Sequence, residues 1–500
     1  MSIAQQAVRG AAWTIASSMG SRAVSLVGTM VITHYVAPAA YGEVSVAVVL
    51  VLTASAFSNF GLGNFVIARP NAPARVAFHA TVYHVLLGVL ALLLMLGLHE
   101  PLGRMLGATE VGRYLPWLTV SVLFDRMGYM PERILVRDMK FRVVGLTRTV
   151  SELTYTVVAV GLAMAGLGAD AIVAASVVRA LLRMLLFAWA SDRTKWLTPA
   201  PLSRETTREL MAFGLPMAVS GLANVGSRYW DNAIISSMFG PGVMGLYAQA
   251  YNLADVPANQ VGEHIGDVLL PSMAHLPGEK RKEALIRSTG LLALVVFPLA
   301  VGLGAIAPTL VGAVFNEEWQ GMAPMLLVLS ALSVTRPVGW TIGSYLKVQD
   351  YPRALMAAEV FKVAALVGWL LVLGRLGPLW ACCGVGLAFG SHALLGMILV
   401  QRLDKIPVRR FVPALLPPLF ACVPMVAAIV GVRAALGFIG ISLPGVVQLL
   451  VEVTVGASAY VGGALVLARK ASSEFLTLVR KSFMRKKGAI SPRETKQGSG

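Results

Sequence analysis

Charged residues are scarce in this sequence: they make up 13% of its 500 residues, whereas hydrophobic residues make up 56%. Soluble globular domains carry about 25% charged residues, so this composition excludes a soluble protein and indicates a membrane protein. Cysteine is rarer still, and Cys382, Cys383 and Cys422 all lie in apolar segments without histidines at metal-ligand spacing. The cysteines therefore indicate neither a disulfide framework nor a metal site.

Signatures of catalysis and of nucleotide hydrolysis are missing as well. The sequence contains no Walker loop, no GxSxG elbow and no cluster of histidine and cysteine with metal spacing. Its longest predicted connections, 194–210 and 266–284, are too short to form a folded soluble domain. We therefore predict that the protein is not an enzyme, and we expect no cofactor.

The sequence contains instead a series of apolar segments about 20 residues long, the length that crosses roughly 30 Å of hydrocarbon as a helix. The first follows a single charge, Arg9, and has no cleavage pattern, so we predict a spanning helix rather than a signal peptide. We predict an all-α membrane protein with about fourteen transmembrane helices, at residues 10–33, 41–67, 76–98, 113–135, 143–166, 170–191, 211–238, 241–265, 285–307, 322–347, 353–374, 378–400, 411–435 and 443–468.

Lysine and arginine gather in alternate connections between these helices, and they account for most of the net charge of +17. The connections on the other side contain only Arg104, Arg113 and Arg375 as basic residues. Because cytoplasmic loops are enriched in lysine and arginine, this division predicts that both termini are cytoplasmic. Charges placed as topology signals give no reason to expect a nucleic acid as partner.

The first six predicted helices align with helices seven to twelve when the sequence is shifted by about 206 residues. Arg22 then meets Arg228, Tyr41 meets Tyr247, and both halves begin on the cytoplasmic side, which predicts a parallel internal repeat. We predict an N-terminal lobe at 1–192, a cytoplasmic linker at 193–210, a C-terminal lobe at 211–402, helices thirteen and fourteen at 403–468, and a basic cytoplasmic tail at 469–500. The tail is either a short helix on the membrane surface or a solvated segment.

Several arginines lie deep inside the apolar segments, where a guanidinium costs about 2.5–3.5 kcal/mol on insertion scales. The candidates for an anion-binding cavity are Arg22, Arg126, Arg179, Arg183 and Arg228. Arg179 and Arg183 share a helix face, and neither these two nor Arg22 has an acid within one helical turn. They therefore favour binding of an anionic substrate. Arg336 is also deep, whereas Arg133 lies near a helix end, where the side chain reaches the membrane surface at little cost.

Acidic residues inside the predicted helices are candidates for coupling to protons or cations. They are Asp125, Asp231, Asp255 and Glu263. Each could equally form an ion pair with a neighbouring helix. Asp231 follows Arg228 by three residues on one helix face, so this pair is either a structural ion pair or a switch that releases the arginine to an anion.

Two stretches resemble a known family. One comprises Tyr41-Gly-Glu43 and Phe57-Ser-Asn-Phe-Gly-Leu62; the other comprises Arg228-Tyr-Trp-Asp-Asn-Ala-Ile-Ile235, Gly245-Leu-Tyr-Ala248 and Leu269-Leu-Pro-Ser272. They resemble the Wzx-type polysaccharide exporters, or O-antigen flippases, of the MOP superfamily. The Arg228-x-x-Asp231 pattern matches the start of that family's second lobe, and Arg22 corresponds to a position often charged in its first helix.

The resemblance implies a MATE- and MurJ-like arrangement of two lobes around a cationic cavity. It also implies flipping of undecaprenyl-pyrophosphate-linked oligosaccharide repeat units across a bacterial inner membrane by alternating access, with the polymerase and the chain-length regulator of the pathway as possible partners. A related lipid II flippase or an ion-coupled multidrug antiporter is the alternative. A membrane polysaccharide polymerase or ligase is a second alternative, although it would need a large extracytoplasmic loop that the sequence lacks.

Overall fold

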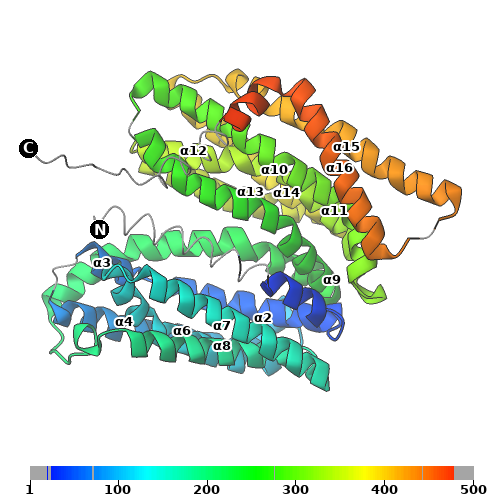
Figure 1. Cartoon of the computed structure of the whole chain (residues 1–500). Coiled ribbons are helices and arrows are strands. Elements are labelled where there is room, and N and C mark those ends of the chain that lie inside the picture. Colours follow the sequence, from blue (N-terminus) through cyan, green and yellow to red (C-terminus); the bar gives the residue numbers. More distant parts are fainter. Residues whose placement is uncertain (1–19, 21–23, 70–72, 275, 442, 478–500) are drawn as a thin grey trace, which may run out of the picture. The chain divides into compact units, whose positions relative to one another are not determined.

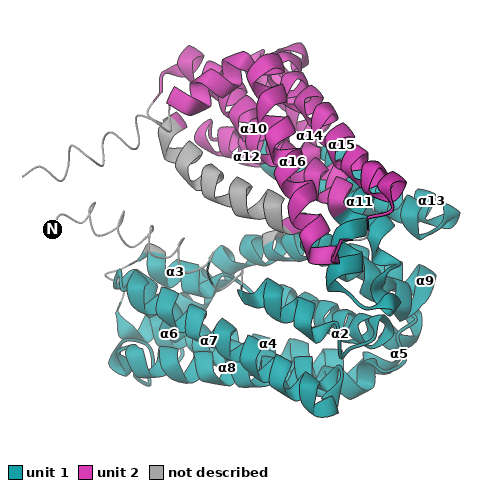
Figure 2. Cartoon of the chain, turned by 45° about the vertical axis from the view of Figure 1, so that its right-hand side comes forward, with its two compact units in different colours: residues 1–253, 307–329, 353–392 teal, residues 254–306, 330–352, 393–500 magenta. Residues whose placement is uncertain are grey.

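The computed structural model describes residues 20, 24–69, 73–274, 276–441 and 443–477. These residues form helices joined by short connections, and the described part of the chain contains no strand. The predicted all-α fold is therefore confirmed. Most of the helices that follow are labelled in Figure 1, and α5 is labelled in Figure 2.

The N-terminal part consists of helices that match the predicted segments in order. They are α2 (Pro38–Phe57), α3 (Leu62–Ala68), α4 (Ala74–Gly97), α5 (His99–Met105), α6 (Val111–Arg137), α7 (Phe141–Leu162), the π-helical turn η1 (Ala163–Leu167) and α8 (Asp170–Ala190). A single 3-10 turn, η2 (Arg193–Lys195), precedes the next helix.

The remaining helices continue to residue 467. They are α9 (Arg204–Ala274), α10 (Gly278–Val314), η3 (Glu317–Trp319), α11 (Met322–Leu332), η4 (Ser333–Thr335), α12 (Arg336–Val348), α13 (Pro352–Leu373), η5 (Gly374–Leu376), α14 (Pro378–Asp404), η6 (Val408–Arg410), α15 (Val412–Ile439) and α16 (Gly445–Leu467). Residues 469–477 of the predicted tail are helical too, and the rest of the tail lies outside the described residues.

Among the described residues, eleven helical segments are long and apolar enough to cross a membrane. Three predicted helices account for the difference from fourteen. The first lies largely outside the described residues, α6 is not apolar enough along its length, and the eighth is continuous with the seventh in α9. The count of fourteen stays a prediction.

Helix boundaries differ from prediction where the backbone changes direction inside an apolar run. The predicted helix 41–67 is interrupted between α2 and α3, where Gly61 adopts a left-handed conformation with φ of 58°. Gly240, with φ of 79°, divides α9 without an intervening loop. The predicted loop 266–284 is wrong over most of its length, because α9 extends to Ala274 and α10 begins at Gly278.

The chain divides into two compact units, coloured separately in Figure 2. Unit 1 comprises residues 1–253, 307–329 and 353–392, and unit 2 comprises 254–306, 330–352 and 393–500. This division follows contacts between residues, so the predicted lobe boundaries remain a prediction.

In unit 1, α6 is the central helix. It packs against α2, α3, α4, α5, α7 and α8. A buried apolar cluster that includes Leu62, Phe65, Ala80 and Met130 joins α3 and α4 to α6.

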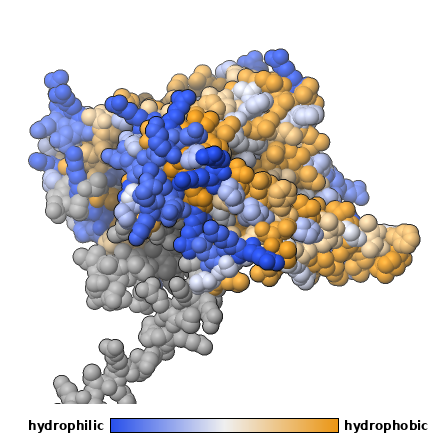
Figure 3. Space-filling model, turned by 90° about the horizontal axis from the view of Figure 1, so that it is seen from above, coloured by the Kyte–Doolittle hydropathy of each residue, from blue (hydrophilic) through white to orange (hydrophobic). Residues whose placement is uncertain are grey.

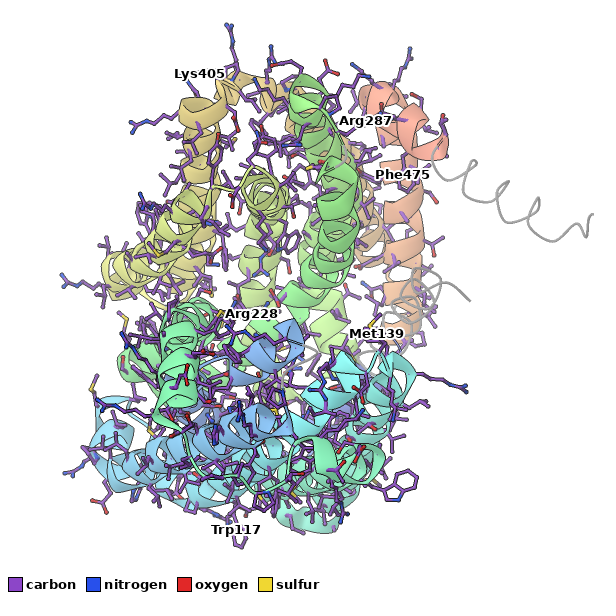
Figure 4. All side chains as sticks on the ribbon, turned by 90° about the vertical axis from the view of Figure 1, so that its left-hand side faces the viewer. Trp117, Met139, Arg228, Arg287, Lys405 and Phe475 are labelled. Carbon is purple, nitrogen blue, oxygen red and sulfur yellow. The ribbon has the colours of Figure 1, made fainter. Side chains whose placement is uncertain are left out.

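In unit 2, α15 and α16 pack closely around a cluster that includes Phe297, Met425 and Tyr460. An ion pair crosses the same contact: half-buried Arg433 donates to both carboxylate oxygens of buried Glu452, at 3.2 and 2.8 Å. Arg287 and Lys405, which both belong to predicted cytoplasmic segments, lie at one end of this unit (Figure 4).

Contacts between the connections of unit 1 follow the predicted topology. Two connections predicted to be cytoplasmic meet where Arg69 pairs with Glu209 at 2.9 Å. Two connections predicted to be extracytoplasmic meet where Arg113 pairs with Asp170. Connections assigned to the same side by charge therefore touch one another.

Large apolar side chains cover much of the surface, as expected for contact with lipid. Phe438 is 94% exposed and Trp189 is 81% exposed. The labelled Trp117 points away from its unit in Figure 4, and hydrophobic residues cover a broad area of the face in Figure 3. Exposed apolar area on this scale is typical of a lipid-facing surface rather than a water-facing one.

Candidate functional site

Helix α6 carries two acid–base pairs in adjacent positions, Asp125-Arg126 and Glu132-Arg133. Residues seven apart lie two helical turns apart on one face, because a turn contains 3.6 residues. The two acids therefore share one face of α6, and the two arginines share another. We call these the acidic face (Asp125 and Glu132) and the basic face (Arg126 and Arg133).

The acidic face is neutralised by arginines of α7 and α8. Arg183 donates to Asp125 through Nε at 3.1 Å and also through Nη2, and Arg148 pairs with Glu132. A third pair joins Arg179 of α8 to Glu152 of α7 at 3.4 Å. Arg179 and Arg183 have no acid within a turn of their own helix, as predicted, but neighbouring helices supply one to each.

Arg126 on the basic face is 4% exposed and has only neutral partners among the described residues. Its Nη1 donates to the carbonyl oxygen of His84 at 3.2 Å. Its Nη2 donates to the carbonyl oxygen of Ser55 at 2.8 Å and to the hydroxyl groups of Ser55 and Ser58. A side chain at Gly88 would occupy the place of the Arg126 stem, 2.3 Å from Cδ. Neutral oxygens thus replace water around this guanidinium without cancelling its charge.

Arg133 on the same face forms no ion pair with any residue that the structure describes. Its guanidinium lies 4.8 Å from the ring centroid of Tyr129, and its buried Nε has no hydrogen-bond partner. The Tyr129 ring in turn stacks on His84 at 4.3 Å. Sequence reasoning assigned Arg133 to the membrane surface and missed it as a site residue. The sequence gives no signal for it, because the neighbouring Glu132 is neutralised by Arg148 from another helix, α7.

A polar cavity of about 340 Å³ opens beside Arg133. Its polar lining is Asn59, Asn64, Tyr129 and Arg133, and Gly61, Met217 and Gly221 complete it. No carboxylate belongs to this lining. The cavity therefore offers hydrogen-bond donors and one positive charge, which suits an anion.

A second cavity, of about 550 Å³, lies in unit 2 and is almost entirely apolar. It is lined by residues of α15 and by Leu467 at the end of α16, with Arg409 as its only charged residue. This lining suits a hydrocarbon chain and offers little to a polar headgroup.

The predicted pairing of Arg228 with Asp231 is absent from the described residues. Asp231 is 1% exposed and accepts hydrogen bonds from Tyr247 Oη at 2.6 Å and from the Asn232 backbone N–H at 2.9 Å. Arg228 is exposed on α9 and forms no ion pair with a described residue (Figure 4). The carboxylate therefore joins the two parts of α9, and the guanidinium is accessible.

Of the other predicted site residues, Asp255 pairs with Arg336 within unit 2. Arg22 and the side chain of Glu263 lie outside the described residues. The structure thus groups Asp125, Arg126, Arg179 and Arg183 around α6, and Arg228 lies on another helix.

Two helix starts of unit 1 meet without side chains between them. A side chain at Gly42 of α2 would lie 1.9 Å from the carbonyl oxygen of Pro241, and one at Gly245 would lie 1.9 Å from that of Pro38. In each helix start a glycine follows a proline by four residues. Each glycine lies against the carbonyl oxygen of the proline in the other helix start. Both starts are on the predicted extracytoplasmic side. We call this contact the glycine seal.

Further contacts surround the glycine seal. The Trp319 indole donates to the Val36 carbonyl oxygen at 3.2 Å. The Ser236 hydroxyl donates to the Leu106 carbonyl oxygen at 2.7 Å. The carboxylate of Glu43 accepts from the backbone N–H groups of Thr109 and Glu110 at 3.0 and 3.1 Å. These contacts tie the connections at the predicted extracytoplasmic end of unit 1 to one another.

Comparison with known proteins assigns the chain to a family. The chain is 25% identical over 495 residues to the succinoglycan biosynthesis transport protein ExoT of Rhizobium meliloti, covering 95% of this chain and 96% of that one. It is 23% identical over 409 residues to the lipopolysaccharide biosynthesis protein WzxC of Escherichia coli, covering 81% and 80%.

Its fold is similar to that of the lipid II flippase MurJ in an inward closed conformation. The TM-score is 0.73 at 14% identity, and the match covers 91% of this chain and 98% of that one. A model of the polysaccharide biosynthesis protein family matches residues 31–324, which is more than half of the chain. The resemblance seen in the sequence is thus confirmed, and the chain belongs to the polysaccharide biosynthesis protein family.

Proposed function

We propose that this protein flips undecaprenyl-pyrophosphate-linked oligosaccharide repeat units across the bacterial inner membrane, for synthesis of a capsule, exopolysaccharide or O-antigen. It is a membrane transporter rather than an enzyme. The observation that carries the proposal is the group of arginines in unit 1 that no described carboxylate neutralises: Arg126, Arg133 and Arg228. A cationic interior favours a substrate with a strongly anionic headgroup.

The transport mechanism follows from the two ends of unit 1. Alternating access requires one end to be closed while the other admits substrate. The glycine seal closes the predicted extracytoplasmic end, and the polar cavity beside Arg133 lies at the predicted cytoplasmic end, where lipid-linked sugars are assembled. The structure therefore supports a state that receives substrate from the cytoplasmic leaflet.

The predicted site residues are given roles on this basis. Arg22, Arg126, Arg179, Arg183 and Arg228 remain proposed ligands of the pyrophosphate. Arg179 and Arg183 would have to exchange Glu152 and Asp125 for the substrate, whereas Arg228 is accessible without such an exchange. Asp125, Asp231, Asp255 and Glu263 remain proposed coupling sites for a proton or cation.

Both termini are proposed to be cytoplasmic, since the basic connections share one side. The polymerase and chain-length regulator of the same pathway are proposed partners, because they act on the product at the opposite side. The bilayer itself is the remaining partner.

A deletion strain separates this function from its rivals. We expect loss of polymer and accumulation of lipid-linked repeat units in the cytoplasmic leaflet, measured by accessibility to an impermeant sugar-modifying reagent in oriented vesicles. Accumulation in the outer leaflet instead would indicate a polymerase or ligase. Cell lysis with lipid II accumulation would indicate a lipid II flippase, and drug sensitivity with normal polymer would indicate an antiporter.

A further inference from the structure

The cavity beside Arg133 is a candidate binding site that sequence analysis did not assign. We propose that Arg133, with Asn59, Asn64 and Tyr129, is the receiving site for the diphosphate of the lipid carrier at the cytoplasmic end. This inference rests on the proposed function, and it names where that function begins.

The lining selects for an anion. The two terminal nitrogens of Arg133 supply four N–H donors, since its Nε is buried. The two asparagine amides supply further N–H donors, and Tyr129 supplies a phenolic O–H. The side-chain oxygen Oδ1 of Asn59 already accepts from the Gly61 backbone N–H at 3.2 Å, so the side-chain nitrogen of Asn59 is the group left for a ligand. A cation would find no carboxylate in this lining.

The charge of Arg133 is kept available by the other face of α6. Its neighbour Glu132 is 12% exposed and pairs with Arg148 of α7. Asp125, one position before Arg126, is taken by Arg183 of α8. Because both nearby acids of α6 point to other helices, the guanidinium of Arg133 has the aromatic ring of Tyr129 as its only described partner. A guanidinium held by an aromatic face can still donate in its own plane to phosphate.

The position of Arg133 is fixed by its surroundings. A side chain at Gly63 of α3 would lie 2.5 Å from Arg133 Cγ and 2.6 Å from Tyr129 Cε1. The stems of both residues therefore lie across the backbone of α3, and Tyr129 is stacked on His84 from the other side. Gly63 is thus a positioning residue for the site.

The location of the cavity fits a first encounter with substrate. Its residues come from the α2–α3 junction, the last turns of α6 and the early part of α9. These segments adjoin the connection that carries the Arg69–Glu209 pair, on the predicted cytoplasmic side. A volume of about 340 Å³ is at the lower end of the roughly 300–1,000 Å³ of small-ligand pockets, which fits a diphosphate with little of the glycan.

The shared chemistry of possible ligands is a phosphate ester anion in a membrane. It could come from the lipid carrier or from an abundant phospholipid such as phosphatidylglycerol. The fork of Arg133 and the surrounding neutral donors can contact both phosphates of a diphosphate, whereas a phosphodiester offers one charge. We therefore commit to the carrier diphosphate.

The test is a binding titration of the purified full-length protein in phosphatidylcholine nanodiscs. The probes are undecaprenyl pyrophosphate, undecaprenyl phosphate and phosphatidylglycerol. We expect Arg133→Gln to raise the Kd for undecaprenyl pyrophosphate about 10- to 100-fold, as for loss of a charge-assisted bond. Arg133→Lys should recover part of the affinity, because it keeps the charge and loses the fork.

Gly63→Ala should weaken binding about 3- to 10-fold by displacing the Arg133 stem. Two controls accompany these variants. Gly97→Ala adds a methyl group where no atom lies within 4 Å, and Arg104→Gln removes one charge at the predicted opposite side, where the arginine side chain is 76% exposed. Both should bind as the wild type does. Thermal melting of each variant in nanodiscs checks that the fold is retained.

Three results would overturn the assignment. In the first, the wild type binds undecaprenyl pyrophosphate and both Arg133→Gln and Arg133→Lys keep its Kd within twofold. This result would exclude Arg133 as the binding site and would not contradict the proposed function. In the second, phosphatidylglycerol binds the wild type as tightly as undecaprenyl pyrophosphate does, and Arg133→Gln weakens both equally. The cavity would then be a general phospholipid site. Failure of the wild type to bind undecaprenyl pyrophosphate would instead remove the proposed function.

Discussion

The two faces of α6 hold opposite charges at the same seven-residue spacing, and they lie in different environments. Asp125 and Glu132 meet arginines of α7 and α8, whereas Arg126 and Arg133 meet carbonyl oxygens, hydroxyl groups and an aromatic ring. The acidic face therefore holds three helices together by neutral pairs. The basic face leaves positive charge inside unit 1, and this difference separates structural charges from those available to a substrate.

The largest effect is expected from truncating the basic face at its most buried residue. Arg126→Ala removes a side chain that is 4% exposed and leaves a cavity between α2, α4 and α6. We expect a loss of about 2–4 kcal/mol in the free energy of unfolding. Thermal melting in detergent, calibrated against denaturant, measures it.

Arg126→Met is the matched variant, because it fills much of the volume without the charge. It should melt close to the wild type, since an uncompensated buried charge costs free energy, yet export of polymer should fall. If Arg126→Met exported normally, the charge of the basic face would have no role in transport.

A smaller effect is expected on the acidic face. Asp125→Asn removes the charged partner of Arg183. The side chain of Asp125 is 28% exposed and that of Arg183 is 26% exposed, so water screens the change only in part. We expect a loss of about 1–2 kcal/mol, and the double variant Asp125→Asn/Arg183→Gln should recover about half of it. Melting of the four proteins in a double-mutant cycle measures the coupling.

Export distinguishes the two roles proposed for Arg183. If the pair only holds helices, the double variant should export more than either single variant. A well-folded double variant without export would mean that Arg183 binds the substrate, as the sequence first suggested.

The smallest effect is expected from Glu132→Gln, which frees Arg148 and removes the acid beside Arg133. Because Arg148 is 49% exposed, the pair adds at most about 1 kcal/mol to stability. Affinity for undecaprenyl pyrophosphate should rise about 2- to 3-fold, and more at low salt, because a nearby negative charge is lost. Unchanged affinity at every salt concentration would indicate that Glu132 is too well neutralised to influence the cavity.

Sequence patterns predicted most helices of this fold, because apolar length is a local property. They missed the break at Gly61 and the division of α9 at Gly240, since either glycine could also sit inside a straight helix. They also missed the early start of α10, whose first turns are charged.

For the site, the sequence identified the deep arginines but not their partners. A search within one helical turn cannot find Glu152 for Arg179 or Asp125 for Arg183, because those contacts cross between helices. The spacing of Arg228 and Asp231 also suggested an ion pair, but the carboxylate of Asp231 accepts a hydrogen bond from Tyr247 instead. The neutralisation of Glu132 by Arg148 was beyond sequence reasoning, and so Arg133 was overlooked.

The glycine seal has a consequence for the energy of opening. Gly42 and Gly245 close the predicted extracytoplasmic end by backbone contact, so no ion pair must be broken at that point. Contacts of a backbone Cα–H with a carbonyl oxygen contribute only about 0.5–1 kcal/mol each. Inverting a two-state population from 1:99 to 99:1 takes about 5.5 kcal/mol. The glycine contact itself therefore supplies only a small part of that free energy, and opening must also break the hydrogen bonds that Trp319, Ser236 and Glu43 form around it.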